Sequence, residues 1–422
     1  KEIEQGLNEP QPKVSSTQGY GRVDKAAAWL LLARLYMNAE VYTGTADWAD
    51  AKTYAKKVID SPYKLYTAKK GQWSAYQQLF MGDNGENGSS VEAIFPILQD
   101  GKKTTSWGTT LFLMAGCNDN KERVKSATEK GNNTTEGWAG NRMRPDLVQK
   151  FFPNNDAPNI SAYAMPAAAD DDRALFDGDG RNVTNGDDEN GVKVFTNGFS
   201  VCKFNNFKTD GSAGHDSKFP DADFFLMRAA EAYLMYAEAD ARQNGGTTTA
   251  DGAKYINELR SRAHATTYTA YSLRQICDEW SREFYFEGLR RTTVQRVRES
   301  ENIELITNAL VEQIKGDASG VTGVVVKDKT SGAARELQLP GIFVFVGLDV
   351  RNEVLKNESG KFICDITSGG QVAVNLKMQT SVHGLFAAGD MRQDAPKQVV
   401  CAAGDGAVAA LSAIAYLQGH DK

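Results

Sequence analysis

Residues 278–305 read D-E-W-S-R-E-F-Y-F-E-G-L-R-R-T-T-V-Q-R-V-R-E-S-E-N-I-E-L. This stretch joins two parts of the chain that differ in their residue patterns. Before about Leu289 the sequence is helical, aromatic and loop-rich. After about Thr293 it has short Val/Ile/Phe strands, glycine turns and a final helix of small residues. The stretch therefore decides how the two parts of the chain are understood.

The pattern across this joint predicts one continuous helix. Phe284, Glu287 and Arg291 are followed by Val294, Val297 and Arg298 with spacings of three and four, as on one helix face. No Gly/Pro/Ser linker separates the parts, although independently folded domains are usually joined by one. We expect two unrelated pieces, residues 1–291 and 292–422, joined within a helix.

The bulk composition limits the partners of the 422-residue chain. The net charge is -6 and the pI is near 5.5, which argues against nucleic acid because binding it needs a basic surface. No run of about eighteen apolar residues is present, so no transmembrane segment is predicted. Residues 1–13 show no apolar core of a signal peptide, and we expect the chain to be part of a longer one.

The cysteines and histidines show no metal-binding or catalytic pattern. The five cysteines and four histidines are scattered, so neither a C-x-x-C pair nor a Cys/His cluster can be drawn. No metal site is expected, because the D-G-D-G at 177–180 lacks the later Gly and Glu of a calcium loop. No Ser/His/Asp arrangement suggests a catalytic residue.

The first part is predicted to be mainly α. Helices are expected as a pair within 21–66, near 144–152, over 223–242 and over 251–263, and from Ser272 into the joint, with a strand at 92–97. The first pair, with small Ala between large Trp, Tyr and Leu, resembles a tetratricopeptide unit. The charged residues Arg282, Glu283, Glu287 and Arg290 are interpreted as ion pairs on a solvated helix face.

Four motifs of the first part resemble one family. They are G-R-V-D-K-A-A-A-W-L-L-L-A-R-L-Y-M-N-A, F-F-L-M-R-A-A-E-A-Y-L-M-Y-A-E-A, I-N-E-L-R-S-R-A and R-E-F-Y-F-E-G-L-R. In this order they resemble the SusD/RagB outer-membrane glycan-binding lipoproteins. The resemblance implies a tetratricopeptide-containing fold, a glycan ligand, a SusC-type TonB-dependent porin as partner, and a location at the cell surface. By this resemblance, we expect the N-terminal part and the tail of that family to be missing from the chain.

Two tryptophans of the first part are candidate ligand-binding residues. Trp107 and Trp138 lie in glycine-bearing, loop-rich surroundings, where their rings could stack on sugars. The alternative is that each ring packs within its own loop, as large aromatic side chains commonly do.

The second part is predicted to be an α/β fragment. A strand is expected at 302–306, then a β-meander over 311–339 and a strand buried on both faces at 341–347. A short strand at 385–390 and a helix from Lys397 complete it.

The motifs G-I-F-V-F-V-G, T-S-V-H-G-L-F-A-A-G-D and K-Q-V-V-C-A-A-G-D-G-A-V-A-A of this part resemble the C-terminal third of bacterial thioredoxin reductases, flavoproteins with two dinucleotide-binding domains. The resemblance implies FAD and NADPH, and it assigns flavin contacts to Gly389, Asp390, Gln398 and Val399. However, no G-x-G-x-x-G follows a predicted strand and no redox C-x-x-C is present, so no bound cofactor is expected.

Two functions therefore remain open. The chain is predicted to be a non-enzymatic, SusD-type glycan-binding module that carries an incomplete flavoprotein fragment, and it is interpreted as a composite. The alternative is an FAD- and NADPH-dependent thioredoxin-disulfide reductase. The first family works at the outer membrane and the second works in the cytoplasm, so one chain would have to serve two compartments.

Overall fold

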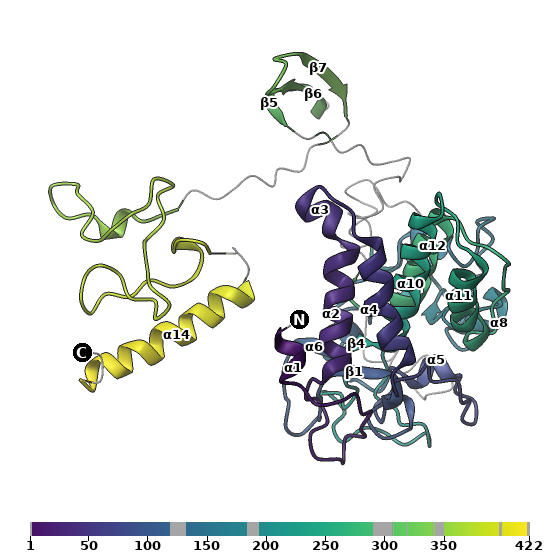
Figure 1. Cartoon of the computed structure of the whole chain (residues 1–422). Helices are drawn as coiled ribbons and strands as arrows, with labels where there is room; N and C mark the ends of the chain where they lie inside the picture. Colours follow the sequence, from purple (N-terminus) through teal and green to yellow (C-terminus); the bar gives the residue numbers. More distant parts are fainter. Residues whose placement is uncertain are drawn as a thin grey trace. The chain divides into compact units, whose positions relative to one another are not determined.

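The computed structural model describes residues 2–118, 132–183, 194–289, 306, 308–318, 320–339, 341, 350–395 and 399–419 (Figure 1). The chain divides into two compact units, Lys1–Leu305 and Ile306–Lys422. Helices predominate, and the sheets are small. The helices and strands of the first unit are α1 (Glu2–Gln5), α2 (Lys25–Met37), α3 (Ala39–Thr43), α4 (Trp48–Asp60), α5 (Ala75–Gln78), η1 (Ser89–Glu92), β1 (Ala93–Ile97), α6 (Thr109–Ala115), α7 (Pro145–Val148), α8 (Met165–Ala169), β2 (Phe176–Asp177), β3 (Ser200–Val201), β4 (Phe224–Arg228), α10 (Ala229–Gln243), α11 (Ala250–Arg262) and α12 (Leu273–Phe284).

Helix α10 is the centre of the first unit. Every residue from Ala229 to Ala241 is buried, and the helix contacts α2, α4, α11 and α12 (Figure 1). Six alanines of α10 let the neighbouring helices approach closely, while Tyr233, Leu234 and Tyr236 fill the space between them. The predicted helix pairs of this unit are confirmed as α2 with α4 and α10 with α11.

The predicted helix over 223–242 is wrong at its beginning. Residues Phe224–Arg228 form strand β4, which pairs antiparallel with β1, the strand predicted at 92–97. The chain becomes helical only after Arg228, whose backbone is extended at φ -137° and ψ 154°. The apolar run of β4 fits a strand as well as a helix, and pairing with a segment far away in the sequence decides between them.

Buried charges lie where α12 meets this strand pair. The acidic members are Glu92, Asp171, Glu279, Glu283 and Glu287, and the basic members are Arg173, Lys203, Arg228, Arg260 and Arg262. The Arg228 guanidinium lies 2.8 Å from Glu92, 2.7 Å from Glu283 and 2.7 Å from Glu287. The interpretation of Glu283 and Glu287 as ion pairs on a solvated face is therefore wrong about the solvent, because both are buried. Arg282 is paired with Glu279, and Arg290 lies outside the described residues.

Helix α12 ends at Phe284, so the predicted continuous helix is wrong from Tyr285 to Gly288. Tyr285 is extended (ψ 142°), and Phe286 has φ +61°. The Glu283 carbonyl accepts hydrogen bonds from Tyr76 Oη at 2.5 Å, Arg228 Nη2 at 2.9 Å and Lys203 Nζ at 3.2 Å. Because these tertiary donors occupy a carbonyl that the next helical turn would use, the helix stops there. The rest of the predicted joint helix lies outside the described residues.

The second unit holds an antiparallel meander and one long helix. Strands β5 (Ala309–Asp317), β6 (Gly320–Asp328) and β7 (Ala334–Gln338) pair in sequence order, which confirms the predicted meander. After the short turns η3 (Glu353–Leu355) and η4 (Gly389–Met391) comes α14 (Val399–Leu417), the predicted final helix. Cys364, Val372 and Ala387 form the small buried cluster of the 350–395 segment.

One strand predicted in the second unit is wrong, and two others cannot be compared with the structure. The predicted strand at 385–390 is wrong, because Phe386 makes one isolated bridge to Gln379 and Gly389 begins η4. The strands predicted at 302–306 and 341–347 fall almost wholly outside the described residues. Within the described part of this unit, every strand pairing of the sheet is antiparallel.

Candidate functional site

Four aromatic side chains of the first unit gather into one partly exposed group, which we call the aromatic surface: Trp107, Phe112, Trp138 and Phe219. The Trp107 and Trp138 rings lie 6.2 Å apart between centroids and are tilted by 36°. Phe112 packs on Trp138 at 6.1 Å, and Phe219 packs on Trp107 at 5.5 Å. Trp107 is 55% exposed and Trp138 is 37% exposed, so both side chains are partly open to solvent.

Three segments far apart in the sequence bring these rings together. Trp107 stands just before α6, and Phe112 lies within that helix. Trp138 is fixed by its backbone N–H, which donates to the Ala115 carbonyl at 2.9 Å at the end of α6. Phe219 comes from the loop that leads to β4. The structure therefore brings together the two predicted tryptophans.

A lysine lies at the edge of the aromatic surface. The Lys218 ammonium is 5.2 Å from the centre of the Trp107 ring and 3.6 Å from the Glu136 carboxylate. A cation over an indole face is attracted by the ring quadrupole, which makes the face of the neutral ring partly negative. The aromatic surface thus combines apolar ring faces with charged groups beside them, which suits a ligand with both apolar and hydroxyl-bearing faces.

Carboxylates hold the two loops that carry Trp107 and Phe219. Asp221 is buried, and its oxygens accept hydrogen bonds from the backbone N–H groups of Gly101 and His215, both at 2.7 Å. Asp216 accepts from the N–H groups of Phe219 and Lys218, and these bonds lower the pKa of its carboxyl. Hydrogen bonds to the Asp216 and Asp221 carboxylates therefore hold the loops that carry Trp107 and Phe219.

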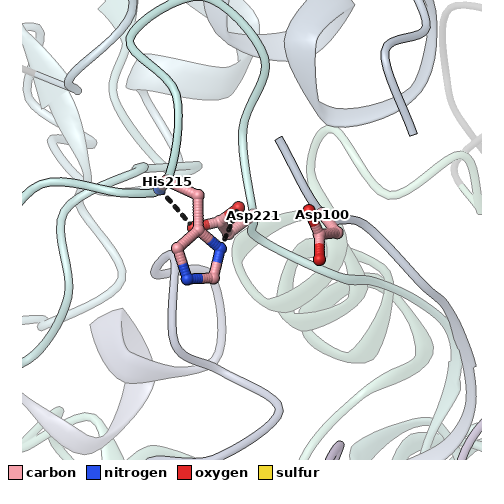
Figure 2. Close-up of side chains that lie close together, drawn as sticks. All are labelled: Asp100, His215 and Asp221. Carbon is pink, nitrogen blue, oxygen red and sulfur yellow. Dashed lines mark hydrogen bonds and ion pairs between the residues drawn. The ribbon is translucent and has the colours of Figure 1, made fainter. Parts of the chain in front are cut away.

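The same loops hold a possible set of metal ligands that the sequence did not reveal. Ligand atoms of Asp100, His215 and Asp221 lie within 4.8 Å of one another (Figure 2). Both Asp221 oxygens already accept N–H groups, and Asp100 accepts from Lys102 and Lys103 at 2.9 and 3.2 Å. A cation would compete with these bonds, and Asp221, which accepts from both Gly101 and His215, serves first as a link between the two loops.

Sequence reasoning missed Phe112, Phe219 and Lys218 as neighbours of the tryptophans. Phe112 alone carried a local signal, because it stands on the short helix directly after Trp107. Phe219 and Lys218 lie in a loop whose position depends on the pairing of β4 with β1, and no local pattern indicates that pairing.

The predicted flavin contacts of the second unit have different surroundings in the structure. The Gly389 N–H donates to Asp405 of α14 at 3.3 Å, and Arg392 forms an ion pair with the same carboxylate. Asp390 is exposed, Val399 begins α14, and Gln398 lies outside the described residues. The assignment of flavin contacts to Gly389, Asp390, Gln398 and Val399 stays a prediction.

The comparisons with known proteins give two separate matches. Residues 176–330 match the model of the SusD family, and residues 282–406 match that of the pyridine nucleotide-disulphide oxidoreductases. The starch-binding protein SusD of Bacteroides thetaiotaomicron is 40% identical in an alignment of 355 positions that covers 76% of this chain and 59% of that protein. The chain contains a SusD/RagB family region and, in its C-terminal part, a thioredoxin reductase-like fragment. The thioredoxin reductase of Helicobacter pylori is 51% identical over 128 residues, 30% of this chain and 41% of that enzyme.

Solved structures resemble the same two parts. The surface glycan-binding protein A of Bacteroides uniformis covers 72% of this chain and 56% of its own, with 19% identity and a TM-score of 0.45. The Lactococcus lactis thioredoxin reductase covers 30% of this chain and 40% of its own, with 32% identity and a TM-score of 0.26. The chain thus spans less than two thirds of these relatives. The helices within the described ranges include none that is long and apolar enough to cross a membrane.

Proposed function

We propose that the SusD/RagB family region is a non-enzymatic module that binds a glycan on the aromatic surface. The observation that carries this proposal is the pair of exposed indole rings, Trp107 and Trp138, with centroids 6.2 Å apart. Aromatic rings offer a large apolar face at a small cost in conformational entropy, which suits stacking against the apolar faces of sugar rings. The 36° tilt between the rings favours a curved glycan over a flat one.

The resemblance supports an α-glucan as the first ligand to test, because the 40% identical relative is named a starch-binding protein. By the same resemblance, the partner of the module is a SusC-type TonB-dependent porin, and its place is the outer membrane at the cell surface. The test is electrophoresis of the purified chain through gels that contain starch or other polysaccharides. Retardation by starch supports the proposal, whereas equal mobility in every gel counts against it.

We further propose that residues 292–422 are an incomplete flavoprotein fragment of a composite chain, joined between Leu289 and Thr293. The engaged Gly389 amide and the exposed Asp390 support this, as does the share of the Helicobacter pylori reductase that the match covers, 41%. The alternative is a thioredoxin-disulfide reductase that uses FAD and NADPH. An absorbance spectrum separates the two, because stoichiometric flavin in the purified chain would favour the reductase and a colourless chain the fragment.

A further inference from the structure

A cavity of about 440 Å³ lies in the first unit, beside the segment that precedes α2. Its wall comes from residues within 8–24, from Tyr63 after α4, and from Ala93, Ile94 and Pro96 of β1. The volume is within the range of about 300–1,000 Å³ that is usual for small-molecule sites. No residue of the aromatic surface belongs to this wall, so the cavity is a separate feature of the first unit.

Hydrogen bonds hold the 8–24 segment in place. The Ser15 N–H donates to the Gly85 carbonyl at 2.9 Å. The Tyr20 hydroxyl donates to the Asp223 carboxylate at 2.8 Å. Because the wall is already fixed by such contacts, a ligand that binds there loses little free energy to ordering the protein.

Two cationic side chains line the cavity close to each other. Lys13 is half-buried and Arg22 is exposed. A Cβ at Gly19, where φ is +85°, would lie 2.7 Å from the Lys13 ammonium nitrogen and 4.0 Å from the Arg22 Cδ, so the glycine leaves room for both side chains. Within the part of the chain that the structure describes, neither cation forms an ion pair or a side-chain hydrogen bond. Two neighbouring cations without a counter-ion favour an anionic ligand.

The two carboxylates that line the same cavity already have partners. Asp24 accepts hydrogen bonds from the Ala26 N–H at 2.9 Å and from the Tyr63 hydroxyl at 2.8 Å. Glu9 forms an ion pair with Lys25. An anionic ligand can therefore contact the two cations without displacing a carboxylate of the protein.

Three amide side chains add hydrogen-bonding groups to the wall: Asn8, Gln11 and Gln18. Among the described residues, none of these amide groups has a hydrogen-bond partner. Each amide offers two donors and a carbonyl acceptor, which suits the hydroxyl groups of a polyol. Together with the cations, the amides favour a ligand that carries both a negative charge and several hydroxyl groups.

We propose that this cavity binds an acidic monosaccharide, with Lys13 and Arg22 on its charged group and the three amides on its hydroxyl groups. The charged group is a carboxylate in a sugar acid and a phosphate in a sugar phosphate, and both present oxygen acceptors to the same two cations. Because Arg22 is exposed, the affinity is modest and falls as the ionic strength rises.

Isothermal titration calorimetry of the full chain with glucuronate and with glucose 6-phosphate tests this site. At least one of them should bind with a Kd below about 10 mM, and the tighter one identifies the charged group. Glucose has the hydroxyl groups without the charge, whereas acetate and inorganic phosphate have the charge without the hydroxyl groups. Each of these three probes should bind at least about ten-fold more weakly than the tighter sugar.

Lys13→Met and Arg22→Met remove one charge each and keep the length of the side chain nearly unchanged. Each should weaken binding by about ten-fold, because each removes a hydrogen bond to a charged group. Since neither side chain has a partner within the described residues, both variants should keep the circular dichroism spectrum of the wild-type chain. The matched control is Lys69→Met, at an exposed lysine of the first unit that does not line the cavity.

Trp107→Ala distinguishes this cavity from the aromatic surface, because it should leave the affinity for the acidic sugar unchanged. The proposal is overturned if neither glucuronate nor glucose 6-phosphate binds, or if glucose binds as tightly as they do. It is also overturned if the double variant K13M/R22M keeps the wild-type affinity. Loss of binding in Trp107→Ala would overturn it as well, since the sugar would then lie on the aromatic surface.

Discussion

The Glu283 side chain shows how much one residue contributes to the first unit. Its carboxylate is fully buried and pairs with Arg228 at 2.7 Å, as well as with Arg173 and Arg262. Burial costs an ionised group its hydration, so such charges persist only when several partners surround them. Three guanidinium groups on three different segments provide that compensation here.

Glu283→Gln is therefore expected to destabilise the first unit by about 3–5 kcal/mol, because it leaves buried guanidinium groups without their partner. Urea unfolding followed by tryptophan fluorescence measures this change. The control is Glu258→Gln on α11, where a 4.0 Å pair with Lys254 is exposed and the expected change is within about 0.5 kcal/mol. Equal stability of the two variants would contradict the assigned role of Glu283.

Acid should unfold the same unit over a defined pH range. Burial alone would raise the pKa of Glu279, but the guanidinium groups of Arg173, Arg282 and Arg260 outweigh it and lower that pKa to about 2. The pKa of Glu283 is also lowered, against its own burial, by Arg262, Arg228 and Arg173. Since both folded-state pKa values lie below the unfolded ones, their stabilisation is present above about pH 4.5 and is lost as the pH falls towards 2.

Circular dichroism during an acid titration checks this expectation. The wild-type chain should lose helical signal below about pH 4, because protonation of Glu279 and Glu283 removes buried ion pairs. Stability that does not change between pH 5 and pH 2.5 would contradict the effect assigned to these two carboxylates.

For individual side chains, the sequence predicted only part of the interactions that the structure shows. The spacing of Glu283 and Glu287 correctly indicated ion pairs, whereas the assignment of Trp107 and Trp138 to ligand binding stays a prediction. Burial could not be predicted, because the partners Glu92, Arg173 and Arg228 come from segments that no local pattern connects to α12. Likewise, Phe219 joins Trp107 only through the tertiary fold.

At the scale of elements, helix α11 shows a conflict between local preference and packing. Gly252 lies in its first turn, where alanine would be the better helix former by about 1 kcal/mol. However, a Cβ at this position would lie 2.3 Å from the Asp240 carboxylate oxygen of α10. That carboxylate accepts from Lys52 Nζ at 2.6 Å and from the Thr249 N–H at 2.7 Å.

Gly252→Ala is consequently expected to destabilise the first unit by about 1–3 kcal/mol despite its better propensity, because Asp240 must move away from Lys52 and Thr249. Thermal unfolding followed by tryptophan fluorescence measures the effect. The variant Lys254→Ala, on the exposed side of the same helix, should change stability little. A gain in stability from Gly252→Ala would show that propensity outweighs the close contact.

Helices with long regular patterns were predicted well, and boundaries set by distant partners were not. The helices α10, α11 and α14 follow from their periodicity, although β4 took the first residues of the expected helix over 223–242. The end of α12 at Phe284 is decided by donors from Tyr76, Lys203 and Arg228, which sequence spacing cannot reveal. Pairing between remote segments therefore overrode local preference in both places.

At the scale of the whole molecule, the two units differ in the size of their cores. The first unit has large clusters of buried apolar residues around α10, whereas the 350–395 segment of the second buries only Cys364, Val372 and Ala387 as a cluster. All six tryptophans of the sequence lie before Phe284, so tryptophan fluorescence reports on the first unit alone. Far-ultraviolet circular dichroism reports on both units.

Urea unfolding should therefore give two transitions that do not coincide. Circular dichroism is expected to show a first loss of signal at low urea, when the second unit unfolds, before tryptophan fluorescence changes. A small core supports less stability, which is why the second unit should unfold first. Coincident transitions by the two probes would instead mean that the chain unfolds as one cooperative body.

Isothermal titration calorimetry of the full chain with maltoheptaose measures whether the aromatic surface binds a glycan. Trp107→Ala and Trp138→Ala should each weaken binding by about ten-fold or more, because each removes one stacking face. Tyr163→Ala, at an exposed tyrosine outside this surface, should leave the affinity unchanged. If maltoheptaose and longer α-glucans release no heat of binding, or if both tryptophan variants bind as tightly as the wild-type chain, the aromatic surface is not the glycan-binding site.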